Sequence, residues 1–458
     1  MPSQESADLV IEARWVLPIA PINTALVDHA VAVTAGRIVA VGPTEQINAQ
    51  FEPRERVIRR DHALLPGLIN AHTRAATTLF RGLPVYGPRA RWMRETVLPV
   101  ARGCMSPDFV REGTQLAIAE MLRAGITAFA DMYLFPEEAA RAAAAARMRA
   151  VIGLPVTDGP TVWAESATGH LARAEQLWDE YRSHPGVSLY FAPHDVFAED
   201  DQTLARVRRV ADELDARVAM YLAPSRGADS VAGGRHGDRD SGGCSPLLRL
   251  QEMGLLRPGF TAIQPTGLSE KELEIAAATG ICVVACQQSH LRLGGGLCPV
   301  TALDSRGVSV ALGTDSALSV GALDILAEAR ATTLLEGILA GSESDALEGP
   351  RRASSAESVL RMATLGGATA LGLSSLVGSI EPGKAADLVC IDLATLACQR
   401  DTRPADAIVF GATRGQVSDV WTSGRAAVSG GHLLVFDEQE LLTLARRWAK
   451  RIPTGATP

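Results

Sequence analysis

The sequence predicts an α/β protein built on a closed (β/α)8 barrel of the TIM type, with a small β-sandwich beside it. Two observations carry this prediction. Eight short β-rich runs alternate with helix-forming stretches through the middle of the chain, and short alternating runs divided by Gly, Asp and Pro occupy both ends. Alternating β and α units are typical of a parallel sheet, whereas the runs at the two ends are typical of antiparallel hairpins.

The eight runs expected as barrel strands are apolar and rich in β-branched residues, and Ala-, Arg- and Glu-rich intervals separate them. They are residues 64–72, 126–132, 150–156, 187–194, 216–222, 260–265, 281–286 and 308–315. The carboxyl ends of such strands meet at one mouth of the barrel, where barrel enzymes place their active sites. Polar residues at those ends are therefore the candidate site residues.

The domain boundaries follow from this pattern. We expect a barrel domain over residues 63–373 and a discontinuous β-sandwich domain over residues 1–62 and 374–434. Residues 435–458 should form a C-terminal helix packed on the outside, because their apolar positions recur at helical spacing. The polar, glycine-rich segment 233–244 is expected to be a loop.

Composition excludes several classes of protein. The 458 residues carry a formal net charge of -8, so no basic surface is available to attract nucleic acid or an anionic membrane. The chain has no basic leader followed by an apolar stretch and no run of eighteen apolar residues, and we expect a soluble, cytoplasmic protein. Its seven cysteines form no CxxC pair, which argues against a disulfide framework and a cysteine zinc site.

Five segments carry a family resemblance. They are "PGLINAHT" from residue 66, "LFRGLP" from residue 79, residues 106–137, "ALGTDSA" from residue 311 and "GSIEPGKAADLV" from residue 378. The chain resembles the amidohydrolase superfamily over nearly its whole length, and within it the deaminases of 5-methylthioadenosine and S-adenosylhomocysteine. The resemblance implies a barrel that holds a divalent ion, usually zinc, and a homo-oligomeric assembly.

In that family the ion is bound by two histidines after strand one, one after strand five, one after strand six and an aspartate after strand eight. The ion lowers the pKa of bound water, and the resulting hydroxide attacks an amidine carbon so that ammonia leaves. In this chain His72 matches the first histidine and Asp315 matches the aspartate. These two are the residual ligand positions.

The other ligand positions depart from the family pattern. Arg74 stands where the second histidine belongs, and a guanidinium has no lone pair to give a cation. Tyr221 begins the segment that replaces His-x-x-Glu after strand five, and Gln264 replaces the histidine after strand six. Ala285 replaces a further histidine after strand seven that would touch the substrate. We therefore predict no metal cofactor, with an atypical zinc site as the alternative.

Arg74 suggests what takes the place of the ion. Without a metal, Asp315 would be a carboxylate in a half-buried pocket, which is costly unless it is paired. Strand one neighbours strand eight when the barrel closes, so an ion pair between Arg74 and Asp315 is predicted. In the alternative, Arg74 points to solvent among the loops.

The remaining candidates line the same mouth. For metal-independent chemistry, Asp315 or His72 would act as general base, Tyr221 or His194 as acid, and Arg74 would stabilise negative charge. The aromatic and cationic segment 82–98 favours an anionic or flat heteroaromatic ligand. Some of the candidates could instead only satisfy one another. The side chains expected to bind substrate are Gln264, Gln287, His290, Trp92 and Tyr86.

Three functions stay open at this point. The first is a metal-independent enzyme, and the second is a catalytically silent binding or partner protein. Either would bind a nitrogen-heterocyclic, purine-like small molecule. The third is a metal-dependent aminohydrolase of the methylthioadenosine/S-adenosylhomocysteine type, or a related C–N hydrolase, with an atypical site.

Overall fold

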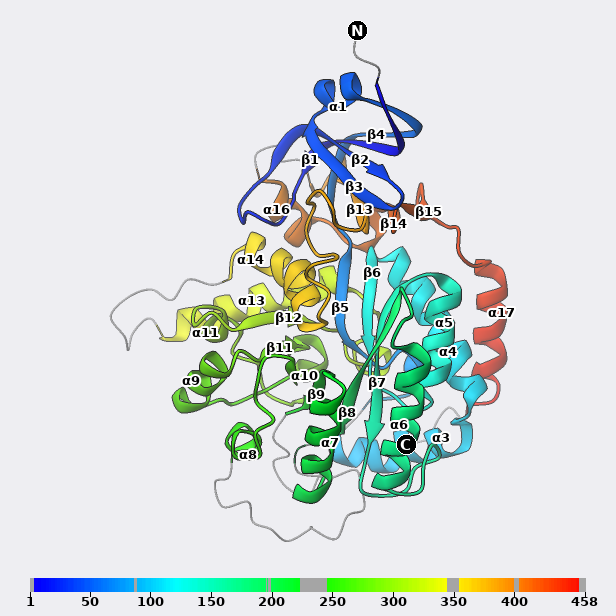
Figure 1. Ribbon diagram of the computed structural model, residues 1–458, viewed down its shortest axis with the longest axis vertical. Helices are drawn as coiled ribbons and strands as arrows, with labels where there is room; N and C mark the ends of the chain where they lie inside the picture. Colours follow the sequence, from blue (N-terminus) through cyan, green and yellow to red (C-terminus); the bar gives the residue numbers. More distant parts are fainter. Residues whose placement is uncertain are drawn as a thin grey trace. The chain divides into compact units, whose positions relative to one another are not determined.

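The computed structural model describes residues 4–85, 89–194, 196, 199–222, 245–343, 354–398 and 403–452 (Figure 1). Two separate eight-stranded sheets form the framework. One is a nearly closed parallel barrel, and the other is a mixed sheet built from both ends of the chain. The predicted (β/α)8 fold class is confirmed. None of the helices in the described ranges is long and apolar enough to cross a membrane.

The barrel sheet runs in the order β12-β11-β10-β9-β8-β7-β6-β5, so each strand lies beside the next one along the chain. Its strands are almost wholly buried, which explains why the sequence shows them as continuous apolar runs. Their bounds are β5 (Leu68–Thr73), β6 (Ile126–Asp131), β7 (Arg149–Val156), β8 (Val187–Pro193), β9 (Val218–Tyr221), β10 (Phe260–Ile263), β11 (Cys282–Ala285) and β12 (Ser309–Leu312).

The barrel closes at the carboxyl ends of its first and last strands. Thr73, the last residue of β5, forms an isolated parallel bridge with Asp315, three residues beyond β12. Asp315 N–H donates to the carbonyl of His72 at 3.0 Å. This bridge brings the two residual ligand positions into neighbouring backbone segments.

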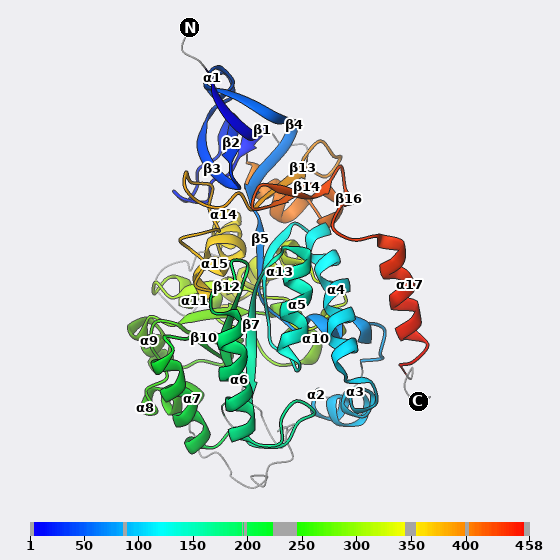
Figure 2. The same ribbon diagram turned by 45° about the vertical axis from the view of Figure 1, so that its right-hand side comes forward.

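Helices follow most of the barrel strands. Helix α9 shows why they form where they do, because Ser269 and Glu272 cap its start reciprocally and Gly280 ends it at φ 67°. Figure 2 shows α5 and α6 beside β7. The helices after β5 are α2 (Arg89–Trp92), α3 (Leu98–Cys104), α4 (Pro107–Arg123), α5 (Pro136–Ala146), α6 (Ala167–Tyr181), α7 (Asp201–Glu213), α8 (Pro246–Glu252), α9 (Glu270–Thr279), α10 (Gln287–Leu293), α11 (Val300–Asp304), α12 (Ala317–Val320), α13 (Ile325–Glu343), α14 (Ala356–Arg361), α15 (Gly367–Ala370), α16 (Pro404–Asp406) and α17 (Glu438–Ala449).

The mixed sheet runs in the order β16-β15-β14-β13-β4-β1-β2-β3. Leu9 and Ile11 of β1 belong to one apolar cluster and Val10 to another, as alternating side chains of a strand require. Helix α1 (Thr44–Gln50) places Ile47 in the second cluster. The strands are β1 (Glu5–Val16), β2 (Leu26–Thr34), β3 (Arg37–Pro43), β4 (Phe51–Pro66), β13 (Leu388–Asp392), β14 (Val417–Thr422), β15 (Arg425–Ser429) and β16 (His432–Leu433).

One predicted strand boundary is wrong. The sequence predicts a barrel strand over residues 64–72, but Leu64 and Leu65 belong to β4, where they pair with Cys390 and Val389. The barrel strand starts only at Leu68. Pro66 has no N–H with which to continue a ladder, so one apolar run is divided between two sheets.

The chain forms two compact units. One comprises Met1–Asn70, Ala119–Ala128 and Asp324–Glu438, and the other Ala71–Ile118, Phe129–Leu323 and Gln439–Pro458. In the second unit, the ring of Trp448 from α17 meets Phe109 of α4 edge-on, with 5.3 Å between the ring centroids. All candidate site residues that the structure describes lie in this second unit.

A buried ion pair in the mixed sheet gives a stability prediction. Arg59 donates to both oxygens of Asp419, at 2.6 and 2.7 Å, and the Asp419 side chain is 2% exposed. Arg59→Met would leave that carboxylate unpaired and should lower the free energy of unfolding by about 3 kcal/mol in urea denaturation. Arg54, also on β4, pairs with Asp8 at 3.4 Å with 80% of its side chain exposed. The matched control Arg54→Met should cost less than about 1 kcal/mol. Equal losses in the two variants would contradict the prediction.

Candidate functional site

Asp315 is the centre of the candidate site, and its backbone is fixed from several sides. Its carbonyl accepts hydrogen bonds from Thr73 Oγ1 at 2.9 Å and from the Arg74 N–H at 3.3 Å. The residue adopts φ 55°, in the left-handed region that aspartate tolerates better than most residues. These constraints hold its side chain, which is only 10% exposed, beside the end of β5.

Three side chains surround the carboxylate of Asp315. His72 Nε2 lies 3.6 Å and Arg74 Nε 3.5 Å from the same oxygen, Oδ1. Ser289 Oγ donates to the other oxygen, Oδ2, at 2.8 Å. The ion pair that the strand order predicts between Arg74 and Asp315 is present, and the Arg74 side chain is 17% exposed, so it does not extend into solvent.

These neighbours change the acid–base properties of the site. Burial alone would raise the pKa of Asp315, but contact with His72, the charge of Arg74 and the hydrogen bond from Ser289 outweigh it and lower that pKa below its usual range. Burial lowers the pKa of His72, although Asp315 opposes this effect. The arrangement therefore holds an ionised carboxylate beside a neutral imidazole at pH 7.

A second carboxyl group, which the sequence analysis did not single out, lies near the same guanidinium. Asp131 is 1% exposed and accepts the Ala75 N–H at 2.7 Å. Burial raises its pKa to about 7, and the Ala75 bond and the charge of Arg74 only partly offset this. Burial also raises the pKa of Tyr133 and of Tyr190, whose hydroxyl donates to the Asp131 carbonyl at 3.1 Å. Asp131 is the last residue of β6, and this position at the carboxyl end of a barrel strand could have identified it as a site residue from the sequence.

Tyr221 and His290 form a buried pair. The hydroxyl of Tyr221 and Nε2 of His290 are hydrogen-bonded, and His290 Nδ1 lies 3.2 Å from the Gly295 carbonyl. Because a carbonyl only accepts, Nδ1 carries the proton, and Nε2 of the neutral ring then accepts from Tyr221. These two predicted site residues thus satisfy each other, as one alternative from the sequence allowed.

The two candidate glutamines differ. The amide of Gln287 donates to the Cys298 carbonyl at 2.8 Å and accepts the Cys298 N–H at 3.2 Å, so it holds the loop that ends at Cys298. Its role in substrate binding stays a prediction. Gln264, at 0% exposure after β10, accepts the Cys286 N–H through Oε1, and its Nε2 has no partner among the described residues.

The remaining candidates lie elsewhere or outside the described ranges. His194 follows β8 and is exposed. Trp92 is 2% exposed and its indole N–H donates to the Pro84 carbonyl, and its contact with substrate stays a prediction. Arg91 and Arg94 both contact Glu95, which reduces the expected cationic character of segment 82–98. Tyr86 and segment 233–244 lie outside the described residues.

The side chains that the structure describes do not make a set that fits zinc. Catalytic zinc needs about three protein ligands. In the ranges that the structure describes, no three His, Cys, Asp or Glu side chains are grouped so that they could hold an ion. At the ligand positions that the structure describes, His72 Nε2 lies 3.6 Å from Asp315 Oδ1, and Arg74 Nε lies 3.5 Å from the same oxygen.

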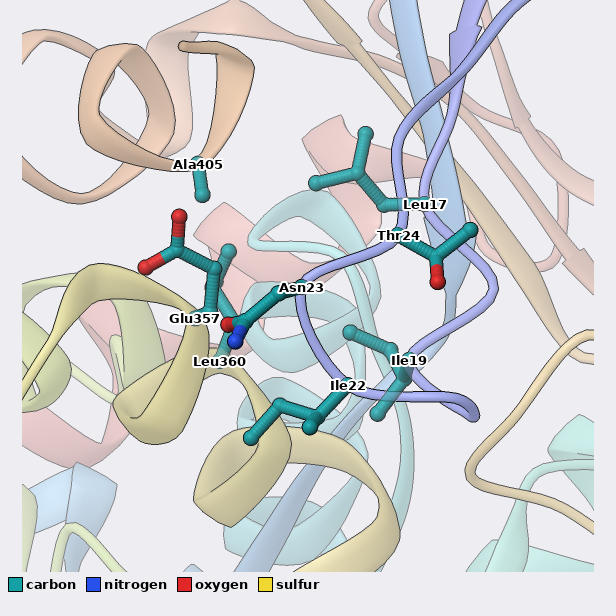
Figure 3. Close-up of a pocket in the computed structure, with 8 residues that line it drawn as sticks. All are labelled: Leu17, Ile19, Ile22, Asn23, Thr24, Glu357, Leu360 and Ala405. Carbon is teal, nitrogen blue, oxygen red and sulfur yellow. The ribbon is translucent and has the colours of Figure 1, made fainter.

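A small recess lies in the other compact unit (Figure 3). It is mainly apolar, and Glu357 is its one ionisable lining residue. Its lining residues are Leu17, Ile19, Ile22, Asn23, Thr24, Glu357, Leu360 and Ala405.

A (β/α)8 barrel with polar groups at the carboxyl ends of its strands has the arrangement in which barrel enzymes place their active sites. The amidohydrolase family model matches residues 63–427, and this chain belongs to that family. It is 36% identical over 454 residues to a 5-methylthioadenosine/S-adenosylhomocysteine deaminase of Teredinibacter turnerae, covering 99% of each chain. It is 34% identical to the protein of the same name from Saccharophagus degradans, covering 99% of this chain and 98% of that one.

Solved structures of other proteins share the fold of this chain. The crystal structure of an adenosine deaminase from Xanthomonas campestris with bound zinc is 40% identical, with a TM-score of 0.92 and coverage of 99% of this chain and 100% of that one. An atrazine chlorohydrolase of Arthrobacter aurescens complexed with zinc, at 22% identity and a TM-score of 0.86 over 97% of this chain and all of that one, shows the fold alone.

The raised pKa of Asp131 predicts a pH-dependent stability. Between the usual aspartate value near 4 and about 7, the folded chain keeps a proton that the unfolded chain has released. The contribution of protonated Asp131 to the free energy of unfolding should therefore be complete below about pH 4 and be lost as the pH rises toward 7. Asp131→Asn keeps an acceptor for Ala75 but cannot ionise, so the melting temperature should fall less between about pH 5 and pH 8 than in the unmodified chain.

The control for this prediction is Asp179→Asn, because 73% of that side chain is exposed on helix α6. It should reproduce the pH profile of the unmodified chain. Identical profiles for D131N and the unmodified chain would show that Asp131 does not titrate in this range.

Proposed function

We propose that the barrel mouth is a metal-independent binding site for a nitrogen-heterocyclic small molecule, with the guanidinium of Arg74 in the electrostatic role of a divalent ion. The observation that supports this most directly is the approach of Arg74 Nε and His72 Nε2 to one oxygen of Asp315, at 3.5 and 3.6 Å. A zinc–carboxylate bond would be about 2.0–2.2 Å long, so an ion bound to that oxygen and to His72 would have to displace Arg74.

Electrostatic repulsion between Arg74 and a divalent ion would disfavour binding of the ion. A divalent ion and a guanidinium about 4 Å apart repel each other by roughly 8 kcal/mol at an effective dielectric constant of about 20. Arg74 cannot lose its proton to relieve this repulsion. The Arg74 side chain is only 17% exposed, so solvent would screen little of the effect.

The chemistry left to the site is acid–base and hydrogen-bonding chemistry. Asp315 is ionised, whereas Asp131 keeps a proton until about pH 7 because of burial, so two carboxyl groups of opposite protonation state flank Arg74. Such a pair suits binding of a heterocycle that both donates and accepts hydrogen bonds. It also suits proton transfer, if the protein is a metal-independent enzyme rather than a silent binding protein.

A metal-dependent aminohydrolase is the second candidate. It is favoured by the relatives at 34–36% identity, which are named as deaminases, and by the zinc-bound deaminase structure at 40% identity. The two functions differ in metal content and in sensitivity to chelators. The homo-oligomer implied by the resemblance stays a prediction.

Metal content is the first test. The protein purified from zinc-supplemented medium should contain less than about 0.1 zinc per chain by elemental analysis, because the site offers two ligands and a fixed positive charge. Arg74→His and Arg74→Met remove the same charge, but only the first adds a ligand, so R74H should retain more zinc than R74M. Stoichiometric zinc in the unmodified chain, lost in a His72→Ala variant, would overturn the proposal.

Turnover is the second test. The unmodified protein should release no ammonia from adenosine or 5-methylthioadenosine above the buffer rate, with or without a chelator, because no activated water is available. Ammonia release that the chelator abolishes would establish the aminohydrolase instead. Release that persists with the chelator and disappears in Asp315→Asn would identify a metal-independent enzyme.

A further inference from the structure

Four side chains at the barrel mouth have buried polar atoms without a hydrogen-bond partner in the described part of the chain. The atoms are Nδ1 and Nε2 of His72, Nε of Arg74, Nε2 of Gln264 and Oδ1 of Asp315. His72 and Gln264 are 0% exposed. Buried polar atoms in folded proteins are nearly always paired, so a cluster of such atoms at one end of a barrel indicates a missing partner.

The strand register places these residues at one level of the barrel. Asp315 N–H bonds to the carbonyl of His72, Gly313 N–H to that of Ala285, and Gln264 N–H to that of Val284. Backbone hydrogen bonds therefore link the carboxyl ends of β10, β11, β12 and β5 around the mouth. A single ligand at this level would face side chains from several strands.

Donors outnumber acceptors in this set. Arg74 Nε and Gln264 Nε2 can only donate, and the Gln264 amide is fixed in this orientation because its oxygen accepts the Cys286 N–H. A neutral His72 ring supplies one donor and one acceptor. Asp315 Oδ1 is the only unpartnered atom of the set that is purely an acceptor, and both Arg74 and His72 already lie near it.

We propose that this site recognises the oxo group of a neutral oxo-substituted nitrogen heterocycle. Its carbonyl oxygen has two lone pairs and accepts from Arg74 and Gln264, while the neighbouring ring N–H donates to Asp315 Oδ1. This inference rests on the proposed metal-free site and narrows its ligand to a chemical class.

The corresponding amino heterocycle fits less well. Its ring nitrogen has one lone pair and can accept from only one of Arg74 and Gln264, and its amino group adds two donors of which only one can reach Asp315 Oδ1. An anionic ligand is also disfavoured, because the charge of Arg74 is matched by Asp315 at 3.5 Å and a second anion would face that carboxylate.

Matched pairs of free bases test the proposal. We expect the full-length, chelator-treated protein to bind hypoxanthine at least about tenfold more tightly than adenine by titration calorimetry, or uracil at least tenfold more tightly than cytosine. Each pair differs in the oxo or amino group at one ring position. Equal or tighter binding of the amino member, or no binding of any of the four bases, would overturn the inference.

Gln264→Glu isolates one donor. The new carboxylate keeps an oxygen for the Cys286 N–H but replaces the Nε2 donor, so the preference for the oxo base should fall at least about fivefold. Gln251→Glu, the same change at an exposed position of α8, should leave binding unaltered. An unchanged preference in Q264E would refute the assignment of the oxo group to Gln264.

The outcomes separate the two proposals. Zinc in the purified protein defeats the metal-free site whatever the bases do. Binding of adenine in preference to hypoxanthine by protein shown to be metal-free defeats only the ligand class.

Discussion

The bridge between Thr73 and Asp315 is the contact on which the geometry of the site depends. It closes the barrel, and with φ at 55° it directs the Asp315 carboxylate toward the end of the first strand. Whatever balances that charge must therefore lie against β5. A protein-supplied cation can come from the residue after Thr73, and this chain has an arginine there, 3.5 Å from the carboxylate oxygen.

One guanidinium near two buried carboxyl groups sets the charge of the mouth. Arg74 lies within ion-pair distance of Asp315, and its charge helps to lower the pKa of that carboxyl group. Burial nevertheless raises the pKa of Asp131 to about 7, despite the same positive charge. A single positive charge cannot fully stabilise both anions in a medium that solvates neither. Near neutral pH the site thus approaches electrical neutrality, and hydrogen-bond pattern rather than net charge would select a ligand.

The sequence predicted the barrel well because its strands are buried on both faces and appear as apolar runs between helices. It also predicted the meeting of Arg74 and Asp315, since barrel closure makes the first and last strands neighbours. It did not predict Asp131, whose acid–base behaviour comes from burial, a property of packing. Nor could it show that Gln287 is tied to Cys298, or that Trp92 bonds to Pro84, because both depend on the paths of irregular loops.

In the proposed metal-free site, hydrogen bonds within the protein would order the barrel mouth. At the positions where the resemblance implies metal ligands, Tyr221 bonds to His290, Gln264 to the Cys286 backbone, and Asp315 to Ser289. Each contact joins a strand end to the segment 286–290 that follows β11, so together they connect the ends of β9, β10 and β12 to it. Zinc would make comparable connections through coordination bonds. Because these side chains hold one another, the proposal requires Arg74 to supply only the charge of an ion and not its ligand geometry, which a guanidinium could not reproduce.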